Sequence, residues 1–234
     1  MKLTTTAFPD QGVIPGEFAF AVIDPAAHVK LSANRNPDFA WTDVPAGTRS
    51  LALICHDPDV PSRGDDVNKE GREVPAALPR VDFFHWAVID MKPDTPGIAR
   101  GEHSSGVTAK GKPGPQAPRE ARHGVNDYTG WFAGDAAMGG DYYGYDGPCP
   151  PWNDAIPHRY VFTLYALDVP RLDVSGKFTG ADVRLAMQGH ILAQAAVTGR
   201  YTLAVTRLLQ LAAGITVLTL GGTIALALRR DRHR

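Results

Sequence analysis

Three short segments of the chain carry side chains that could bind or transform a small ligand. The first contains Asp57 and Asp59 on either side of a proline. The second places His85 in an otherwise apolar run, and the third places His158 and Tyr160 two residues apart, on one face of a strand. Neighbouring carboxylates can keep histidines protonated, and protonated imidazoles donate hydrogen bonds to phosphate. These residue types could therefore bind an anion, and one carboxylate could also receive an ammonium group.

Strands must bring these side chains together, because up to 103 positions separate them. Alternation of apolar and polar residues, with many aromatic and β-branched side chains, is typical of strands. It predicts strands at 18–22, 50–56, 83–91, 158–168 and 199–205. So few helical patterns accompany them that the chain is predicted to be mostly β, without alternating strands and helices.

One helix is predicted to begin near Thr179, whose hydroxyl can cap it while Asp182 stands three residues further on. Its expected apolar face consists of Val183, Met187, His190 and Ile191, and Gly199 follows its predicted end.

Four sequence patterns resemble the phosphatidylethanolamine-binding protein family, especially its bacterial Raf-kinase-inhibitor-like branch. DPDxP occurs at 57–61 and FxHW at 83–86, and GPCPP at 147–151 is followed by HRYxFxLYALD at 158–168. The match runs, in order, over most of residues 18–201. The resemblance implies a β-sandwich of two antiparallel sheets with a small anion pocket at one end.

The same resemblance implies the function and the site. The family binds phosphate-bearing head groups or other small anions, so the expected partner is a phosphate-like anion or a phospholipid head group, with no cofactor and no metal. Carried over residue by residue, the ligand-binding set consists of Asp57, Asp59, His85, His158 and Tyr160, with Pro61, Pro148 and Pro150 shaping the wall.

Each of these residues also has a purely structural interpretation. Asp57 and Asp59 could simply form a turn around Pro58, since both residue types set turn geometry. His85 could be a hydrogen-bonded core histidine, and Tyr160 a core aromatic whose hydroxyl reaches water. The joint presence of the three segments favours the binding site.

Two other classes of function stay open. A hydrolase could use the Asp and His side chains, but HExxH and GxSxG are absent and Cys149 between two prolines has no helix terminus to activate it. A kinase or protease inhibitor would instead use surface loops. The segment 97–140, with Tyr128, Trp131 and Phe132, is the best candidate for such a surface. Its length suggests an ordered functional loop or undetected short strands, as does that of 62–80.

Composition excludes several classes of protein. The 234 residues carry 24 basic and 25 acidic side chains, a balance that gives no basic patch for nucleic acid. With 24 glycines and 19 prolines the chain is rich in loops, yet 44% of its residues are apolar, enough for a core. Two cysteines are too few for a disulfide scaffold. The first ten residues also lack a secretory signal. Together these observations lead us to expect a cytoplasmic domain.

The C-terminal residues depart from the family pattern. Residues 208–228 carry no formal charge and precede an arginine-rich end, and their length could span a bilayer as a helix. The expected organisation is a domain at 1–205 and an apolar helix with a basic tail at 206–234. The helix could tether the domain to a membrane or pack on the domain or on a partner protein; separately, a homodimer is possible. A cytoplasmic domain would send the arginines across the membrane, against their usual preference.

Overall fold

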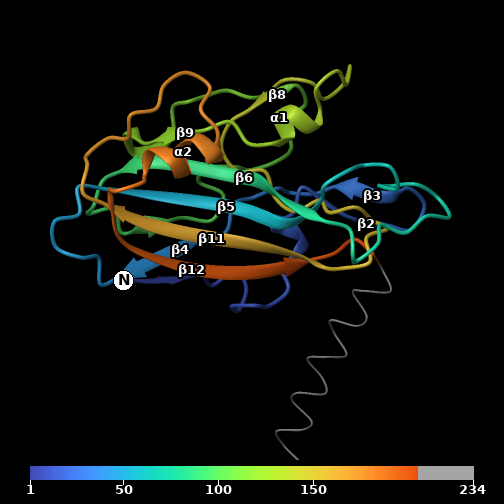
Figure 1. Ribbon diagram of the computed structural model, residues 1–234, viewed down its shortest axis with the longest axis horizontal. Coiled ribbons are helices and arrows are strands. Elements are labelled where there is room, and N and C mark those ends of the chain that lie inside the picture. The colour runs from blue at the N-terminus through green and yellow to red at the C-terminus, as the bar shows by residue number, and fades with distance from the viewer. Residues whose placement is uncertain (205–234) are drawn as a thin grey trace, which may run out of the picture.

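A five-stranded antiparallel sheet forms the centre of the computed structural model, which describes residues 1–204 (Figure 1). In spatial order its strands are β12 (Ile191–Tyr201), β11 (His158–Leu167), β5 (Ser50–Pro61), β6 (Arg80–Met91) and β9 (Arg122–His123). Every neighbouring pair in this sheet is antiparallel.

The middle strand β5 is buried on both faces because its sequence is apolar on both. Leu51, Leu53 and Cys55 belong to one buried cluster, whereas Ala52 and Ile54 belong to another. Successive side chains of a strand point to opposite faces, so a continuous apolar run supplies both cores at once. The central sheet therefore has a core on each side.

The first core joins the central sheet to a three-stranded antiparallel sheet. This sheet consists of β1 (Lys2–Thr4), β4 (Phe39–Thr42) and β7 (Gly97–Ile98). Phe39 and Trp41 of β4 are buried in the same cluster as Trp86 and Phe162 of the central sheet. The opposite core is covered by the helix α2 (Gly180–Ala186), which buries Val183 on the side of the sheet seen uppermost in Figure 1.

The remaining elements are short. The hairpin of β2 (Ala21–Asp24) and β3 (His28–Leu31) extends one end of the molecule, and β8 (Gly111–Lys112) pairs in parallel with β10 (Asp141–Tyr142). Single helical turns occur at η1 (Gly16–Phe18), η2 (Pro118–Glu120) and α1 (Tyr128–Trp131). Segment 97–140 thus contains short strands and turns.

The prediction of a mostly β fold with few helices is confirmed, although the described residues form four sheets where two were expected. The predicted strands 50–56, 83–91 and 158–168 correspond to β5, β6 and β11. The strand predicted at 18–22 starts only at Ala21, because Phe18 ends the helical turn η1.

The helix at Thr179 begins as predicted but ends much earlier. The Thr179 hydroxyl accepts the Asp182 N–H, and the Asp182 carboxylate accepts the Thr179 N–H in return. The helix stops at Ala186, and Gly189 follows with a φ of 82°, a left-handed conformation that does not continue a helix. Residues 191–201 then form the edge strand β12, so pairing with β11 prevails over the helical pattern, and the strand predicted at 199–205 is only the end of β12.

The predicted apolar helix at 208–228 and its basic tail lie outside the described residues. Within residues 1–204, no helix is long and apolar enough to cross a membrane.

Candidate functional site

A cavity of about 500 Å³ opens at the end of the central sheet. Asp57 of β5, His85 of β6, and His158 and Tyr160 of β11 line it, so the sheet brings together the three segments singled out in the sequence. Most of the other lining residues are apolar, and they come from 20–31 with the β2–β3 hairpin, the ends of β5 and β6, segment 64–68, α1 and the residues after it, and the proline-rich loop 147–151. The cavity therefore combines an apolar wall with a small group of polar side chains.

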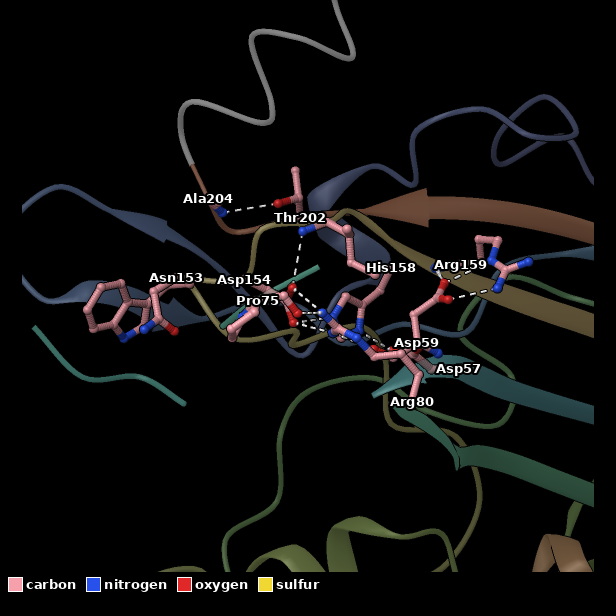
Figure 2. Close-up of polar contacts among 12 residues, drawn as sticks. Asp57, Asp59, Pro75, Arg80, Asn153, Asp154, His158, Arg159, Thr202 and Ala204 are labelled. Atoms are coloured by element: carbon pink, nitrogen blue, oxygen red, sulfur yellow. Dashed lines mark hydrogen bonds and ion pairs between the residues drawn. The ribbon is translucent and has the colours of Figure 1, made fainter. Parts of the chain in front are cut away.

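His158 lies between two buried carboxylates. Its Nδ1 is 2.7 Å from Oδ2 of Asp57, and its Nε2 is 3.1 Å from Oδ2 of Asp154 (Figure 2). Burial alone would lower the pKa of His158, but the charges and hydrogen bonds of the two carboxylates outweigh it and raise the pKa to about 9. His158 is thus an imidazolium at neutral pH, and both of its N–H groups are donated to protein carboxylates.

A partly buried arginine balances the second carboxylate. Arg80 donates from Nη1 and Nη2 to the two oxygens of Asp154 at 2.6 and 3.0 Å. Asp57 is further held by the backbone N–H of Asp59, 2.8 Å from its Oδ1. The formal charges of Asp57, His158, Asp154 and Arg80 sum to zero, so this chain of ion pairs gives the cavity no net positive charge (Figure 2).

His85 differs from His158 in its protonation state. Its Nδ1 lies 2.7 Å from the backbone carbonyl oxygen of Asp146, which can only accept, so Nδ1 carries the proton. Burial lowers the pKa of His85 to about 4, against the opposing effect of the Asp57 charge. At neutral pH His85 is therefore uncharged, and its Nε2, which bonds to no described residue, is an acceptor.

A buried polar cluster fixes the carbonyl that selects this tautomer. The Asp146 carboxylate accepts from Asn34 at 2.7 Å and from Asn126 at 2.8 Å, and Nζ of Lys112 lies 3.0 Å from it. Burial raises the pKa of Asp146 and lowers that of Lys112, while each charge opposes the effect on the other. The Asp146 carbonyl that orients His85 is thus held in place by the contacts of the Asp146 side chain.

The Tyr160 hydroxyl is buried near the Asp57 carboxylate, but it makes no well-aligned hydrogen bond within residues 1–204. The Tyr160 ring lies against that of His85, with the ring centroids 5.1 Å apart and the planes at 67°. Burial, reinforced by the charge of Asp57 and by the contact of the hydroxyl with that carboxylate, raises the pKa of Tyr160 well above its usual value, so the O–H stays protonated. Buried hydroxyls nearly always find a partner, and an unpaired one on a cavity wall points to a ligand.

Comparison with known proteins agrees with this geometry. Residues 4–202 match the family model described as phosphatidylethanolamine-binding protein. The chain belongs to the phosphatidylethanolamine-binding protein family. A UPF0098 protein of Methanothermobacter thermautotrophicus is 32% identical over 86% of this chain and 98% of its own. UPF0098 protein YbhB of Escherichia coli is 31% identical over 72% of this chain and 82% of its own.

Solved structures of the family have the same fold. The crystal structure of Escherichia coli YbcL, described as a new member of the mammalian PEBP family, aligns with a TM-score of 0.61 and 22% identity. The alignment covers 86% of this chain and 97% of the YbcL chain. A homologue from Chlamydia trachomatis, CT736, aligns with a TM-score of 0.55 and 28% identity, covering 86% of this chain and 95% of its own.

In this member of the family, Asp59 does not line the cavity. Its carboxylate binds Arg159 through both oxygens, at 2.7 and 2.9 Å, and accepts the Arg159 backbone N–H at 2.8 Å. Arg159 lowers the pKa of Asp59 although burial opposes it. A register irregularity between Asp57 and Val60 separates the two carboxylates, which strand alternation would have put on one face. The expected pocket residue Asp59 is therefore paired with Arg159 and is not among the residues that line the cavity.

The prolines and the cysteine have distinct places. Pro61 and Pro150 line the cavity, as expected, whereas Pro148 is not among its lining residues. The Pro148 carbonyl instead accepts the Phe20 N–H at 2.9 Å, which ties the proline-rich loop to the start of β2.

Cys149 lines the cavity, and burial raises its pKa to about 12, so the thiol stays protonated. Among residues 1–204, no group of three His, Cys, Asp or Glu side chains is arranged to hold a metal ion.

Sequence reasoning missed Asp154, Arg80 and Asp146. Asp154 lies four residues before His158, but its loop carries no motif that marks it as a partner. Arg80 comes from a position 74 residues away, where it looks like an ordinary basic residue at the start of a strand. Only their burial against opposite charges identifies them, and burial is a property of the fold.

Proposed function

We propose that the protein binds a small phosphate-like anion, free or as the phosphorylated end of a head group, in the cavity at the end of the central sheet, and that it does so without chemical turnover. The observation that carries the proposal is the buried Tyr160 hydroxyl, which lies on the cavity wall beside His85 and makes no well-aligned hydrogen bond within the described residues. An oxyanion would accept this hydrogen bond, and hydrogen bonds to charged groups contribute about 1.5–3 kcal/mol.

The shape of the cavity supports a ligand with one polar end. Phe20, Phe83, Tyr128 and Phe132 are among the residues of its wall, and they would contact an apolar or weakly polar remainder of the ligand. His158 supports the site indirectly. Because both of its N–H groups bind carboxylates, it holds Asp57 and offsets its charge, and it donates nothing to the ligand. This replaces the prediction that both histidines donate to phosphate.

Binding without turnover is supported by the state of each candidate catalytic group. Cys149 and Tyr160 both have raised pKa values, so neither is an activated nucleophile at neutral pH. His158 is protonated and fully paired, and His85, with a pKa of about 4, is a weak base. No pair of described groups in the cavity combines a nucleophile with a base of suitable strength.

Isothermal titration calorimetry with inorganic phosphate at constant ionic strength tests the proposal. Tyr160→Phe removes only the hydroxyl and should weaken phosphate binding about 10- to 100-fold. Tyr165→Phe, the same change on the same strand, is the matched control because Tyr165 packs against the opposite core. It should leave binding unchanged. If wild-type protein shows no phosphate binding, or if the two variants bind equally well, the proposed function is wrong.

The alternative of an inhibitor surface on segment 97–140 is less well supported. Of the three aromatic residues expected to form it, Tyr128 is buried and Phe132 lines the cavity, while Trp131 is 54% exposed. Most of this aromatic surface therefore covers the cavity and is not presented to a protein partner.

A further inference from the structure

His85 presents to the cavity a hydrogen-bond acceptor where an anion site usually has a donor. Its Nδ1–H is donated to the Asp146 carbonyl, so Nε2 carries a lone pair and no proton. The Asp146 carbonyl cannot accommodate the other tautomer, because two acceptors would then face each other across 2.7 Å. Tyr160 beside it contributes an O–H donor. The polar end of the cavity is therefore a donor next to an acceptor.

The surroundings of His85 keep it in this uncharged state. The ionisable and charged groups that act on it come from every side of the site: Asp57 and His56 of β5, His158 and Tyr160 of β11, Tyr128 of α1 and the Asp146 peptide. Asp57 favours protonation, whereas His158, His56 and above all burial oppose it, and the pKa falls to about 4. At pH 7 only about one molecule in a thousand carries a proton on Nε2.

We propose that the cavity prefers tetrahedral oxyanions that retain a proton, and that the retained O–H group donates a hydrogen bond to the Nε2 atom of His85. The proposal rests on the proposed function and narrows its ligand class. Inorganic phosphate and the monoanion of a phosphomonoester have both a P–OH to donate to His85 and an oxyanion to accept from Tyr160. Sulfate and phosphodiesters have no such hydrogen, and their oxygens would face the His85 lone pair.

Asp57 gives an independent reason for the same selection. This buried carboxylate lines the cavity, and its charge is already matched by His158. Each further negative charge on the ligand is repelled by Asp57 in a poorly solvated site. Among the described lining residues, Lys30 is the other cationic side chain besides His158, and it is largely exposed and 3.9 Å from Asp24. A protonated, less charged anion is therefore favoured.

Calorimetry with phosphate and sulfate at pH 7 and constant ionic strength is the first test. The two ions have similar size and shape, but phosphate retains a proton throughout the neutral range and sulfate does not. Sulfate must either leave the His85 acceptor unpaired or protonate it, so it should bind about 100- to 1,000-fold more weakly than phosphate. Equal affinities would overturn the proposal while leaving the proposed function intact. Absence of binding by both ions would remove the proposed function and, with it, this inference.

Methyl phosphate and dimethyl phosphate distinguish a free monoester from the diester of an intact phospholipid. The second proton of a phosphomonoester leaves at a pH of about 6, so methyl phosphate should lose affinity up to about tenfold per unit above that pH. Inorganic phosphate should lose much less over the same range, since its dianion still has a P–OH. Dimethyl phosphate should bind at least tenfold more weakly than methyl phosphate at pH 5.5. Equal affinity for the diester would contradict the proposal and favour a phospholipid head group.

Substitution of His85 gives the residue-level test. His85→Gln places an amide that can donate as well as accept, so the preference for phosphate over sulfate should shrink to about threefold or less. Should this variant fail to fold, the wild-type protein provides a second readout. Sulfate should bind about tenfold more tightly for each unit that the pH falls from 7 towards 4, because it requires protonated His85. A pH-independent sulfate affinity, or a preference unchanged in a folded His85→Gln variant, would overturn the role of His85.

Discussion

Replacement of Asp154 by asparagine should strongly destabilise the protein, because Asp154 is paired with the buried imidazolium of His158 and the partly buried guanidinium of Arg80. His158 has a pKa of about 9 against an ordinary value of 6.5, a difference of about 2.5 units. At about 1.4 kcal/mol per unit, Asp57 and Asp154 together stabilise the charged form of His158 by about 3–4 kcal/mol. Arg80 also loses one of its carboxylate contacts in this variant. We expect Asp154→Asn to lower the free energy of unfolding at pH 7 by about 2–4 kcal/mol.

The pH dependence follows from the direction of the shift. A histidine with a raised pKa in the folded state stabilises fully below its unfolded value of about 6.5, and the stabilisation is lost as pH rises through about 9. Urea unfolding should show this loss in the wild-type protein and a smaller one in Asp154→Asn.

The matched control is Asp168→Asn, which removes a carboxylate 2.9 Å from His190 in an exposed pair. Exposed ion pairs contribute little, so this variant should change the unfolding free energy by less than about 1 kcal/mol. If Asp154→Asn were no more destabilising than the control, or if His158 titrated near pH 6.5 by NMR, the account of the buried ion-pair chain would be refuted.

Three further predictions concern acid stability, helix packing and the C-terminal residues. Because the pKa of His85 is lowered to about 4, the folded state should lose up to about 3 kcal/mol of stability as pH falls from 6.5 through 4, measured by chemical unfolding. Gly180→Ala should destabilise by about 1–3 kcal/mol in thermal unfolding, because the added methyl group collides with the Phe84 ring, whereas Gly130→Ala, which meets nothing within 4 Å, should not. Deletion of 208–234 should leave the unfolding temperature of the remaining domain unchanged, and membrane fractionation of both forms tests the tether: equal partitioning without detergent would contradict it.

The parts of the fold that could be predicted from sequence are those in which local pattern and burial agree. The apolar runs of β5, β6 and β11 belong to strands whose two faces meet defined cores, so their positions could be read directly. Residues 191–198 could not, because β12 is an edge strand whose first half is mostly exposed and lacks a buried alternating face. Its structure is decided by pairing with β11, a non-local interaction.

The site was predictable in its cavity-lining members and not in its charge states. Asp57, His85, His158 and Tyr160 come together as expected because they occupy neighbouring strands. The two histidines differ in protonation because different groups face their rings. Two carboxylates face His158, whereas a single backbone carbonyl faces His85. Sequence spacing carries no information on these partners, and it could not foresee the irregularity that turns Asp59 towards Arg159.

A crystal structure of the protein with inorganic phosphate tests the central claim most directly. The account predicts phosphate in the cavity at the end of the central sheet, with one oxygen about 2.7 Å from the Tyr160 hydroxyl and another within hydrogen-bond distance of Nε2 of His85. Tyr160→Phe crystals grown at the same phosphate concentration should show lower occupancy. Phosphate bound at another place while this cavity holds none, at a concentration that saturates binding in solution, would contradict the account.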